Sequence, residues 1–155
     1  AMGQYHVEVS RVIAARPQEI YAVLADYRTT HPNILPSQYF KELTIEEGGV
    51  GAGTVFRLRM SVMGASREYR MTVSEPEPGR VMVETDAEAG VVTTFTVDPL
   101  ADGAQSRVSI SLTGQTSPGL VGMLEKRLNP LVLRRVFAQE LELLDNYVRT
   151  RQPSP

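Results

Sequence analysis

The side chains best suited to proton transfer lie in the stretch ADYRTTHPNILP, residues 25–36. Asp26, Tyr27 and His31 are close together there, in a chain that contains only two histidines. A carboxylate near an imidazole has the composition of a general acid–base pair. However, no serine, cysteine or second carboxylate is connected to this pair by a motif, as covalent catalysis would require. Because a histidine before a proline is typical of a structural or solvated turn, we expect His31 to contribute little.

The second half of the same stretch indicates a different role. Pro32 and Pro36 disfavour helix in the residues that precede them, so the stretch cannot extend a helix cleanly. Ile34 and Leu35 are bulky and apolar, and they would cover apolar space that other elements leave open. We expect residues 25–36 to form a lid over the mouth of a cavity rather than a catalytic loop.

The glycine-rich segment GGVGAG, residues 48–53, has some likeness to a phosphate-binding loop. No G-x-G-x-x-G pattern can be drawn through its glycines, and a strand rather than a helix is expected after it. We therefore expect a hairpin loop in which the glycines adopt positive φ, and no nucleotide site.

The composition excludes several other kinds of site. The absence of cysteine excludes disulfides and thiolate metal sites, and two histidines do not favour a histidine metal site. With a formal net charge of −2 and no long block of like charge, we expect no nucleic-acid binding. No apolar run approaches the ~18 residues of a membrane span, and residues 1–10 do not resemble a signal peptide. We expect a cytoplasmic protein that needs no metal or organic cofactor.

The first elements that must position these residues are a strand and a short helix. The 155 residues suit a single domain, 1–155, with an ordered part of about residues 5–150. Residues 5–13 alternate between apolar and polar, which predicts a strand with one buried face and Arg11 as its exception. A short helix should follow from Pro17, a residue well suited to a first helical turn.

Six more strands are expected, near residues 39–47, 54–62, 67–75, 81–86, 90–98 and 106–114. Their short connections imply an antiparallel meander. The hairpin over residues 54–75 has a two-residue turn at either Met63-Gly64 or Gly64-Ala65. In both registers the even residues of its first strand oppose the odd residues of its second, so the apolar faces coincide.

Four polar residues fall on strand faces that the alternation turns inward: Arg67, Tyr69, Thr85 and Thr93. In the strand at 81–86 the expected inward set is Val81, Val83 and Thr85. Tyr69 is the best catalytic candidate because it would place a phenol in an apolar cavity, although a core tyrosine whose hydroxyl reaches a partner is the more common case. Arg67 could bind a ligand carboxylate, or reach solvent from the end of the hairpin.

The last third of the chain predicts long helix. An apolar stripe at helical spacing comprises Leu120, Leu124, Leu128, Val132, Val136, Leu141, Leu144 and Val148. Pro130 interrupts the stripe, so we expect either a short helix near 118–128 and a long one near 130–150, or one kinked helix.

A cavity follows from the relative widths of these elements. One helix is about 10 Å wide, whereas a sheet with strands ~4.8 Å apart would be about three times wider. The sheet must therefore curl around the helix, which leaves incompletely filled space between them. The side chains expected to contact a ligand there are Tyr27, Ile34, Leu35, Phe56, Leu58, Met60, Arg67, Tyr69, Met71, Thr85, Thr93, Phe95, Met123, Leu124, Leu128, Val132 and Val136.

The segments VEVSRVIAARPQEIYAVLAD and EEGGVGAGTVFRL, with the long final helix, resemble the START-related, Bet v 1-like (SRPBCC) superfamily of polyketide cyclase/dehydrase and lipid transport type. The resemblance covers about residues 5–150. It implies an α+β helix-grip fold, with a seven-stranded curved antiparallel sheet wrapped around a long C-terminal helix and two short helical elements after the first strand. The chain lacks the lysine that commonly follows the glycine-rich loop in plant members.

Three functions are compatible with this resemblance, whose members include lipid and hormone binders, aromatase/cyclases and co-chaperones. The first is binding or transport of a small hydrophobic ligand, such as a lipid, a polyketide or an aromatic compound. The second is a cyclase or dehydratase-type enzyme in which Tyr69, Arg67 or His31 moves protons. The third is a protein-partner module with a vestigial cavity. The sequence makes no prediction of the oligomeric state.

Overall fold

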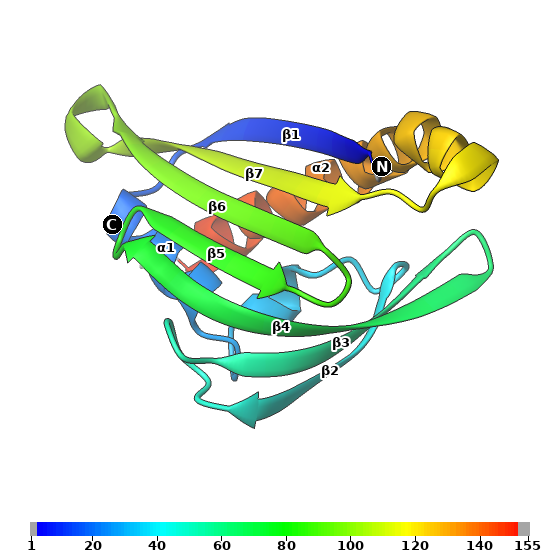
Figure 1. Cartoon of the computed structure of the whole chain (residues 1–155). Helices are drawn as coiled ribbons and strands as arrows, with labels where there is room; N and C mark the ends of the chain where they lie inside the picture. Colours follow the sequence, from blue (N-terminus) through cyan, green and yellow to red (C-terminus); the bar gives the residue numbers. More distant parts are fainter. Residues whose placement is uncertain (1–2, 152–155) are drawn as a thin grey trace.

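The computed structural model describes residues 3–151, which form one sheet with helices on a single face (Figure 1). The elements in chain order are β1 (Gln4–Ile13), α1 (Pro17–Ala25), the 3-10 helix η1 (His31–Ile34), β2 (Phe40–Glu47), β3 (Val55–Val62), β4 (Ala65–Glu77), β5 (Val81–Asp86), β6 (Val91–Leu100), the 3-10 helix η2 (Ala101–Gly103), β7 (Gln105–Gln115) and α2 (Gly119–Arg151). The strands pair antiparallel in the order β1-β7-β6-β5-β4-β3-β2. This arrangement confirms the predicted α+β helix-grip fold.

The β3–β4 hairpin has the facing that the sequence predicts. Phe56 pairs with Met71 and Leu58 pairs with Tyr69, so the two apolar faces coincide. Of the two possible turns, the structure has Met63-Gly64, with φ values of 51° and 81°. Positive φ at both central positions gives the turn a twist that matches the strands on either side.

The glycine-rich segment connects β2 to β3 and holds the end of α1. The Tyr27 backbone N–H donates to the Gly49 carbonyl at 2.9 Å, and the Gly51 N–H donates to the Ala25 carbonyl at 2.9 Å. Gly48, Gly49, Gly51 and Gly53 all have positive φ, as predicted. The segment thus fixes the backbone from which the Tyr27 side chain enters the interior.

The facing of β5 was predicted wrongly. The expected inward residues Val81, Val83 and Thr85 are only half-buried, on the outer face, whereas Met82, Glu84 and Asp86 are buried. Because side chains alternate along a strand, an error of one position reverses the whole set. Three consecutive apolar residues at the start of β5 leave the facing open, and hydrogen-bonding partners elsewhere in the fold allow the two carboxyl groups to be buried.

The C-terminal segment is a single helix of 33 residues with Pro130 inside it, so the alternative with two separate helices is wrong. Such a helix spans roughly 50 Å, whereas a strand of ten residues such as β1 spans about 33 Å. The first turns of α2 therefore project beyond the end of β7 (Figure 1). In the predicted stripe, Leu120, Leu124 and Leu128 are exposed, with Leu120 at 79%, while Val136 and the residues after it are buried.

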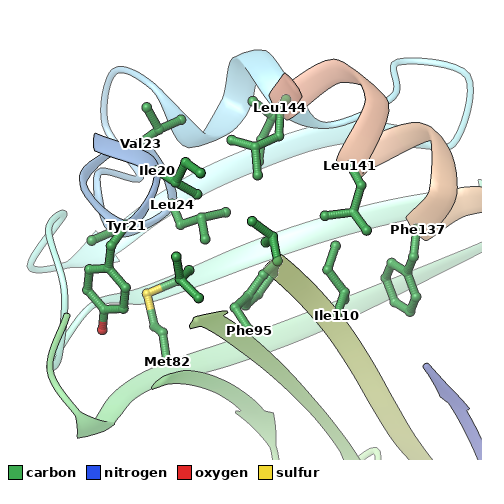
Figure 2. Close-up of a cluster of buried hydrophobic side chains, with 14 of the residues drawn as sticks. Ile20, Tyr21, Val23, Leu24, Met82, Phe95, Ile110, Phe137, Leu141 and Leu144 are labelled. Carbon is green, nitrogen blue, oxygen red and sulfur yellow. The ribbon is translucent and has the colours of Figure 1, made fainter. Parts of the chain in front are cut away.

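The core lies between the sheet and the two longer helices (Figure 2). Ile20 and Leu24 of α1 and Leu144 of α2 meet Met82 and Phe95 of the sheet, and all five are buried. Burying apolar side chains of this size contributes about 1.5–3 kcal/mol each. This packing holds α1 and the second half of α2 on the same face of the sheet.

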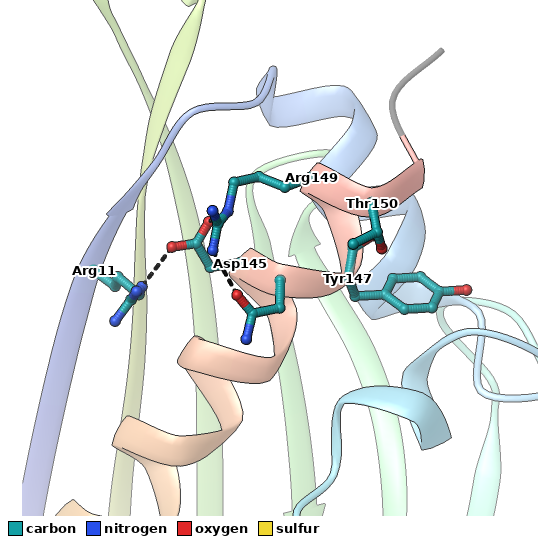
Figure 3. A network of polar contacts seen from close by, with 6 residues as sticks. Arg11, Asp145, Tyr147, Arg149 and Thr150 are labelled. Carbon is teal, nitrogen blue, oxygen red and sulfur yellow. Dashed lines mark hydrogen bonds and ion pairs between the residues drawn. The ribbon is translucent and has the colours of Figure 1, made fainter. Parts of the chain in front are cut away.

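Arg11 is the polar exception on the inner face of β1, and its partner lies on α2 (Figure 3). Its Nε donates to Asp145 Oδ2 at 2.8 Å, and Arg149 Nε donates to Asp145 Oδ1 at 3.0 Å. Asp145 is buried, so the ion pair satisfies a carboxylate that would otherwise be costly in this position. The pair connects β1 to the last turns of α2.

Candidate functional site

A cavity lies between the sheet, η1 and α2. Its volume is about 60 Å³. This is well below the roughly 300–1,000 Å³ that is typical of pockets for drug-sized ligands. The side chains therefore leave only a narrow interior.

Several of the side chains predicted from the sequence line this cavity. They are Leu35, Phe56, Leu58, Met60, Tyr69, Met71, Thr93 and Phe95, together with the catalytic candidate His31. Most come from the inward faces of the β3–β4 hairpin and β6, where alternation placed them correctly. The wall is therefore mainly aromatic and aliphatic, as binding of an apolar molecule requires.

Other predicted contact residues lie elsewhere. Tyr27, Ile34 and Val136 are buried behind the wall, and Val132 and Leu128 line a separate surface hollow beside Met63. Met123 and Leu124 are exposed on the projecting part of α2, and Thr85 is on the outer face of β5. Arg67 is exposed, with its guanidinium 5.4 Å from the centre of the Tyr69 ring. The alternative that Arg67 reaches solvent from the hairpin is thus what the structure has.

The structure also changes the interpretation of residues 25–36. His31 is only 2% exposed and lines the cavity, so of the two expected roles, structural or solvated, the solvated one was wrong. Ile34 is fully buried in the core, and Leu35 is half-buried in the cavity wall. Of the two residues that we expected to cover the cavity, only Leu35 therefore lines it.

Sequence reasoning missed several lining residues, among them Tyr5, Glu84, Leu133, Phe137 and Glu140. Glu140 had a signal, since it lies four residues after Val136 and four before Leu144, on the buried side of α2. Glu84 had no local signal, because the facing of β5 was ambiguous.

The polar end of the cavity is built around Tyr27. Its Oη donates to Glu84 Oε2 at 2.5 Å. Its ring stacks on the His31 imidazole with 4.4 Å between ring centres, and on Phe56 with 4.8 Å. His31 Nδ1 lies 2.6 Å from the Leu24 carbonyl oxygen. Because a carbonyl can only accept, Nδ1 carries the proton and Nε2 is left as an acceptor.

Burial shifts the ionisation of three groups at this end. It raises the pKa of Glu84 to about 7, against the opposing effect of the hydrogen bond from Tyr27. It also raises the pKa of Glu140 well above the usual value, and the nearby Glu84 carboxylate raises it further. Burial lowers the pKa of His31 to about 4, despite the Leu24 carbonyl. Of the two carboxyl groups, Glu140 is therefore the one that burial and the neighbouring carboxylate favour most strongly in its protonated form, and His31 is neutral near pH 7.

Residues 4–149 match the family described as polyketide cyclase / dehydrase and lipid transport. Because the match spans nearly the whole chain, this protein belongs to that family. The solved structure of KanY protein is 33% identical, with a TM-score of 0.81 and coverage of 96% of this chain and 99% of that chain. A comparison with curated proteins gives no match.

More distant structures share the fold alone. The Zhui aromatase/cyclase from Streptomyces sp. R1128 is 19% identical, with a TM-score of 0.77 over 96% of each chain. Norcoclaurine synthase from Thalictrum flavum, in complex with dopamine and hydroxybenzaldehyde, is 16% identical, with a TM-score of 0.71 over 99% of this chain and 91% of that one. Within residues 3–151, no helix could cross a membrane, and no cluster of three acidic or histidine side chains could hold a metal ion.

Proposed function

We propose that this protein binds a small, mostly apolar ligand in the cavity between the sheet and α2. The observation that carries this proposal is a mainly apolar interior space with a polar end, to which Phe56, Tyr69, Phe95 and Phe137 contribute aromatic rings. Aromatic walls favour a planar or aromatic ligand, since rings pack best against offset or edge-on rings. A ligand that buried about 200 Å² of apolar surface would gain roughly 5 kcal/mol before the costs of binding.

The family and the neighbouring structures support this proposal. The family name joins cyclisation, dehydration and lipid transport, all of which act on molecules that an apolar cavity can enclose. The norcoclaurine synthase structure holds dopamine and hydroxybenzaldehyde, two small aromatic compounds. An enzyme is the second candidate function, and the carboxyl groups of Glu84 and Glu140 at the cavity favour it.

The binding proposal can be tested with N-phenyl-1-naphthylamine, an uncharged apolar dye whose fluorescence rises in an apolar site. Leu133 lines the cavity, whereas Leu131, two residues earlier on α2, is exposed and lines only the surface hollow. Leu133→Trp should fill the cavity and weaken dye binding about tenfold or more, equivalent to roughly 1.4 kcal/mol. Leu131→Trp is the matched control and should bind the dye as the wild type does.

The two variants also distinguish dye binding in the cavity from dye binding at the surface hollow. If Leu131→Trp weakened dye binding and Leu133→Trp did not, the dye would bind at the exposed hollow, and the cavity proposal would be wrong. The wild-type chain contains no tryptophan, whereas each variant contains one. The dye should therefore be excited at wavelengths that tryptophan does not absorb, so that the fluorescence of the variants and the wild type can be compared.

A further inference from the structure

Two carboxyl groups reach the cavity from different layers of the fold. Glu84 comes from β5 and Glu140 from α2, and both line the cavity. They are 6% and 2% exposed. No lysine or arginine is among the described residues that line the cavity, and neither carboxyl forms an ion pair within residues 3–151. Buried carboxyl groups without a cation are costly, so a structure that keeps two of them beside a cavity calls for a functional reason.

The two groups have different hydrogen-bonding environments. Glu84 accepts a hydrogen bond from the Tyr27 phenol at 2.5 Å, which favours its ionised form. Glu140 Oε2 is buried and has no hydrogen-bond partner among the described residues. With its proton on Oε2, a protonated Glu140 would therefore be a donor without an acceptor among the described residues. A ligand oxygen in the cavity would supply the missing acceptor.

The other titratable groups that face the cavity are less suited to be its proton acceptor or proton donor. Tyr5 and Tyr69 line the cavity, and burial raises the pKa of each phenol. Tyr27 is engaged by Glu84, and burial keeps its pKa well above the usual value. His31 is neutral because its pKa is lowered to about 4. The hydrogen bond from Tyr27 favours Glu84 as the proton acceptor, and the stronger upward shift of the Glu140 pKa favours Glu140 as the proton donor, as an acid–base pair needs.

We propose that Glu84 and Glu140 form an acid–base pair that moves a proton on an apolar ketone held in the cavity. This inference rests on the proposed function, since it needs a ligand in the same space. The ketone oxygen would accept a hydrogen bond from the Glu140 carboxylic acid, and the carbon next to the carbonyl would face the Glu84 carboxylate. Tyr27 is a positioning residue that holds the Glu84 carboxylate.

The proton transfers balance without another reactant. The C–H bond next to the carbonyl breaks, its proton goes to the Glu84 carboxylate, and its electron pair forms the C=C bond of the enol. The Glu140 O–H bond breaks and gives its proton to the carbonyl oxygen. In the return step Glu84 delivers a proton to carbon, and the enol O–H proton returns to Glu140. In heavy water, exchange of the Glu84 proton with solvent during the enol lifetime would place deuterium on the carbon.

Deuterium exchange into 2-tetralone, followed by NMR in heavy water, tests this pair. The wild-type protein should accelerate exchange over buffer. Glu84→Gln and Glu140→Gln keep the size of each side chain but cannot transfer the proton, so each should slow exchange about 100-fold, within the usual range for general acid–base catalysis. Their affinities for 2-tetralone should stay within about threefold of wild type, well under 1.4 kcal/mol. Glu142→Gln, an exposed change on the same helix, should leave the rate unchanged.

The pH dependence of the exchange rate gives a second test of the acid–base pair, which can be made on the wild-type protein. The wild-type rate should rise as pH increases through about 7, as Glu84 ionises, and should fall at higher pH as Glu140 ionises. Tyr27→Phe removes the hydrogen bond that favours the Glu84 carboxylate, so it should move the rise to higher pH. A merely structural role for Tyr27 would not move the profile.

Failure of the acid–base pair can be distinguished from failure of the proposed binding function. If 2-tetralone binds and the wild type does not accelerate exchange, or if the folded glutamine variants exchange at the wild-type rate, the acid–base pair is wrong and the binding function stands. If neither 2-tetralone nor the apolar dye binds, the proposed function fails and the acid–base pair fails with it. Amide spectra of the variants establish that each is folded.

Discussion

Tyr27 contacts several of the groups that define the polar end of the cavity. Its phenol donates to Glu84, and its ring lies against His31 and Phe56. The sequence predicted Tyr27 as a direct ligand contact, but it lies behind the wall, where it supports Glu84 and His31. At the scale of single residues, Tyr27 thus positions side chains that line the cavity, although Tyr27 does not line it.

The ionisation of Glu140 should be visible in the stability of the protein. Burial raises its folded pKa well above the unfolded value of 4.5. The stabilisation from this protonated form is fully present below pH 4.5 and is lost as pH rises through the folded pKa. Glutamine does not titrate, so Glu140→Gln should gain stability relative to wild type as pH rises from 4.5 toward the folded pKa of Glu140, by up to about 1.4 kcal/mol per pH unit.

Urea unfolding at several pH values measures this difference. Glu84 and His31 remain in both proteins, so their own pH dependence largely cancels in the comparison. Glu142→Gln is the matched control on the exposed side of α2, and its difference from wild type should not change with pH in this way. A flat difference for Glu140→Gln would contradict the idea that burial keeps this carboxyl protonated.

The candidate site could be predicted only in part from single residues. Phe56, Leu58 and Met60 follow from strict alternation in β3, which the structure confirms. Glu140 could have been predicted as a buried residue from its helical spacing, but charged residues are normally assigned to the surface. Glu84 could not be predicted, because its burial depends on a phenol 57 residues away in the chain.

At the scale of elements, the glycine-rich segment positions the polar end of the cavity. Gly49 accepts the hydrogen bond from the Tyr27 N–H, and an added Cβ at Gly49 would lie 2.1 Å from Arg28 Nε. Its φ of +145° is also unfavourable for other residues. The loop was predicted from its glycines, but its contact with the end of α1 was not, because pairing between distant segments leaves no local pattern.

Gly49→Ala should therefore destabilise the protein more than Gly53→Ala. Both positions have positive φ, but an added Cβ at Gly53 meets nothing within 4 Å. We expect Gly53→Ala to cost about 1 kcal/mol from backbone strain, and Gly49→Ala to cost roughly 1–3 kcal/mol more and to weaken dye binding. Urea unfolding and dye titration of the two variants measure the losses of stability and of dye affinity. Equal losses of stability would mean that the contacts of Gly49 with Arg28 and Tyr27 do not contribute to the stability of the protein.

The two halves of α2 illustrate what periodicity alone can predict. The apolar stripe correctly predicted a helix, and its second half packs against the sheet. Its first half has the same spacing but extends beyond the strands, so Leu120 and Leu124 remain exposed. Spacing reports which side of a helix is apolar, while the length of the neighbouring sheet decides which part of that side is covered.

At the scale of the whole molecule, the cavity follows from geometry that the sequence already contains. Seven strands are wider than one helix, so a curled sheet and an incompletely filled interior were predicted, and the structure has both. The contents of that interior were less predictable. Its apolar wall comes from local alternation, whereas its polar end is assembled from η1, β5 and α2, and depends on long-range packing.

Methyl NMR of the methionines tests the central claim, ligand binding in the interior, most directly. Met60 and Met71 line the cavity, whereas Met63 and Met123 are exposed. With 13C-labelled methionine methyl groups and 2-tetralone as the ligand, we predict intermolecular NOEs to Met60 and Met71 and none to Met63 or Met123. NOEs confined to Met63 or Met123, or none at all at saturating ligand, would contradict a ligand-binding cavity between the sheet and α2.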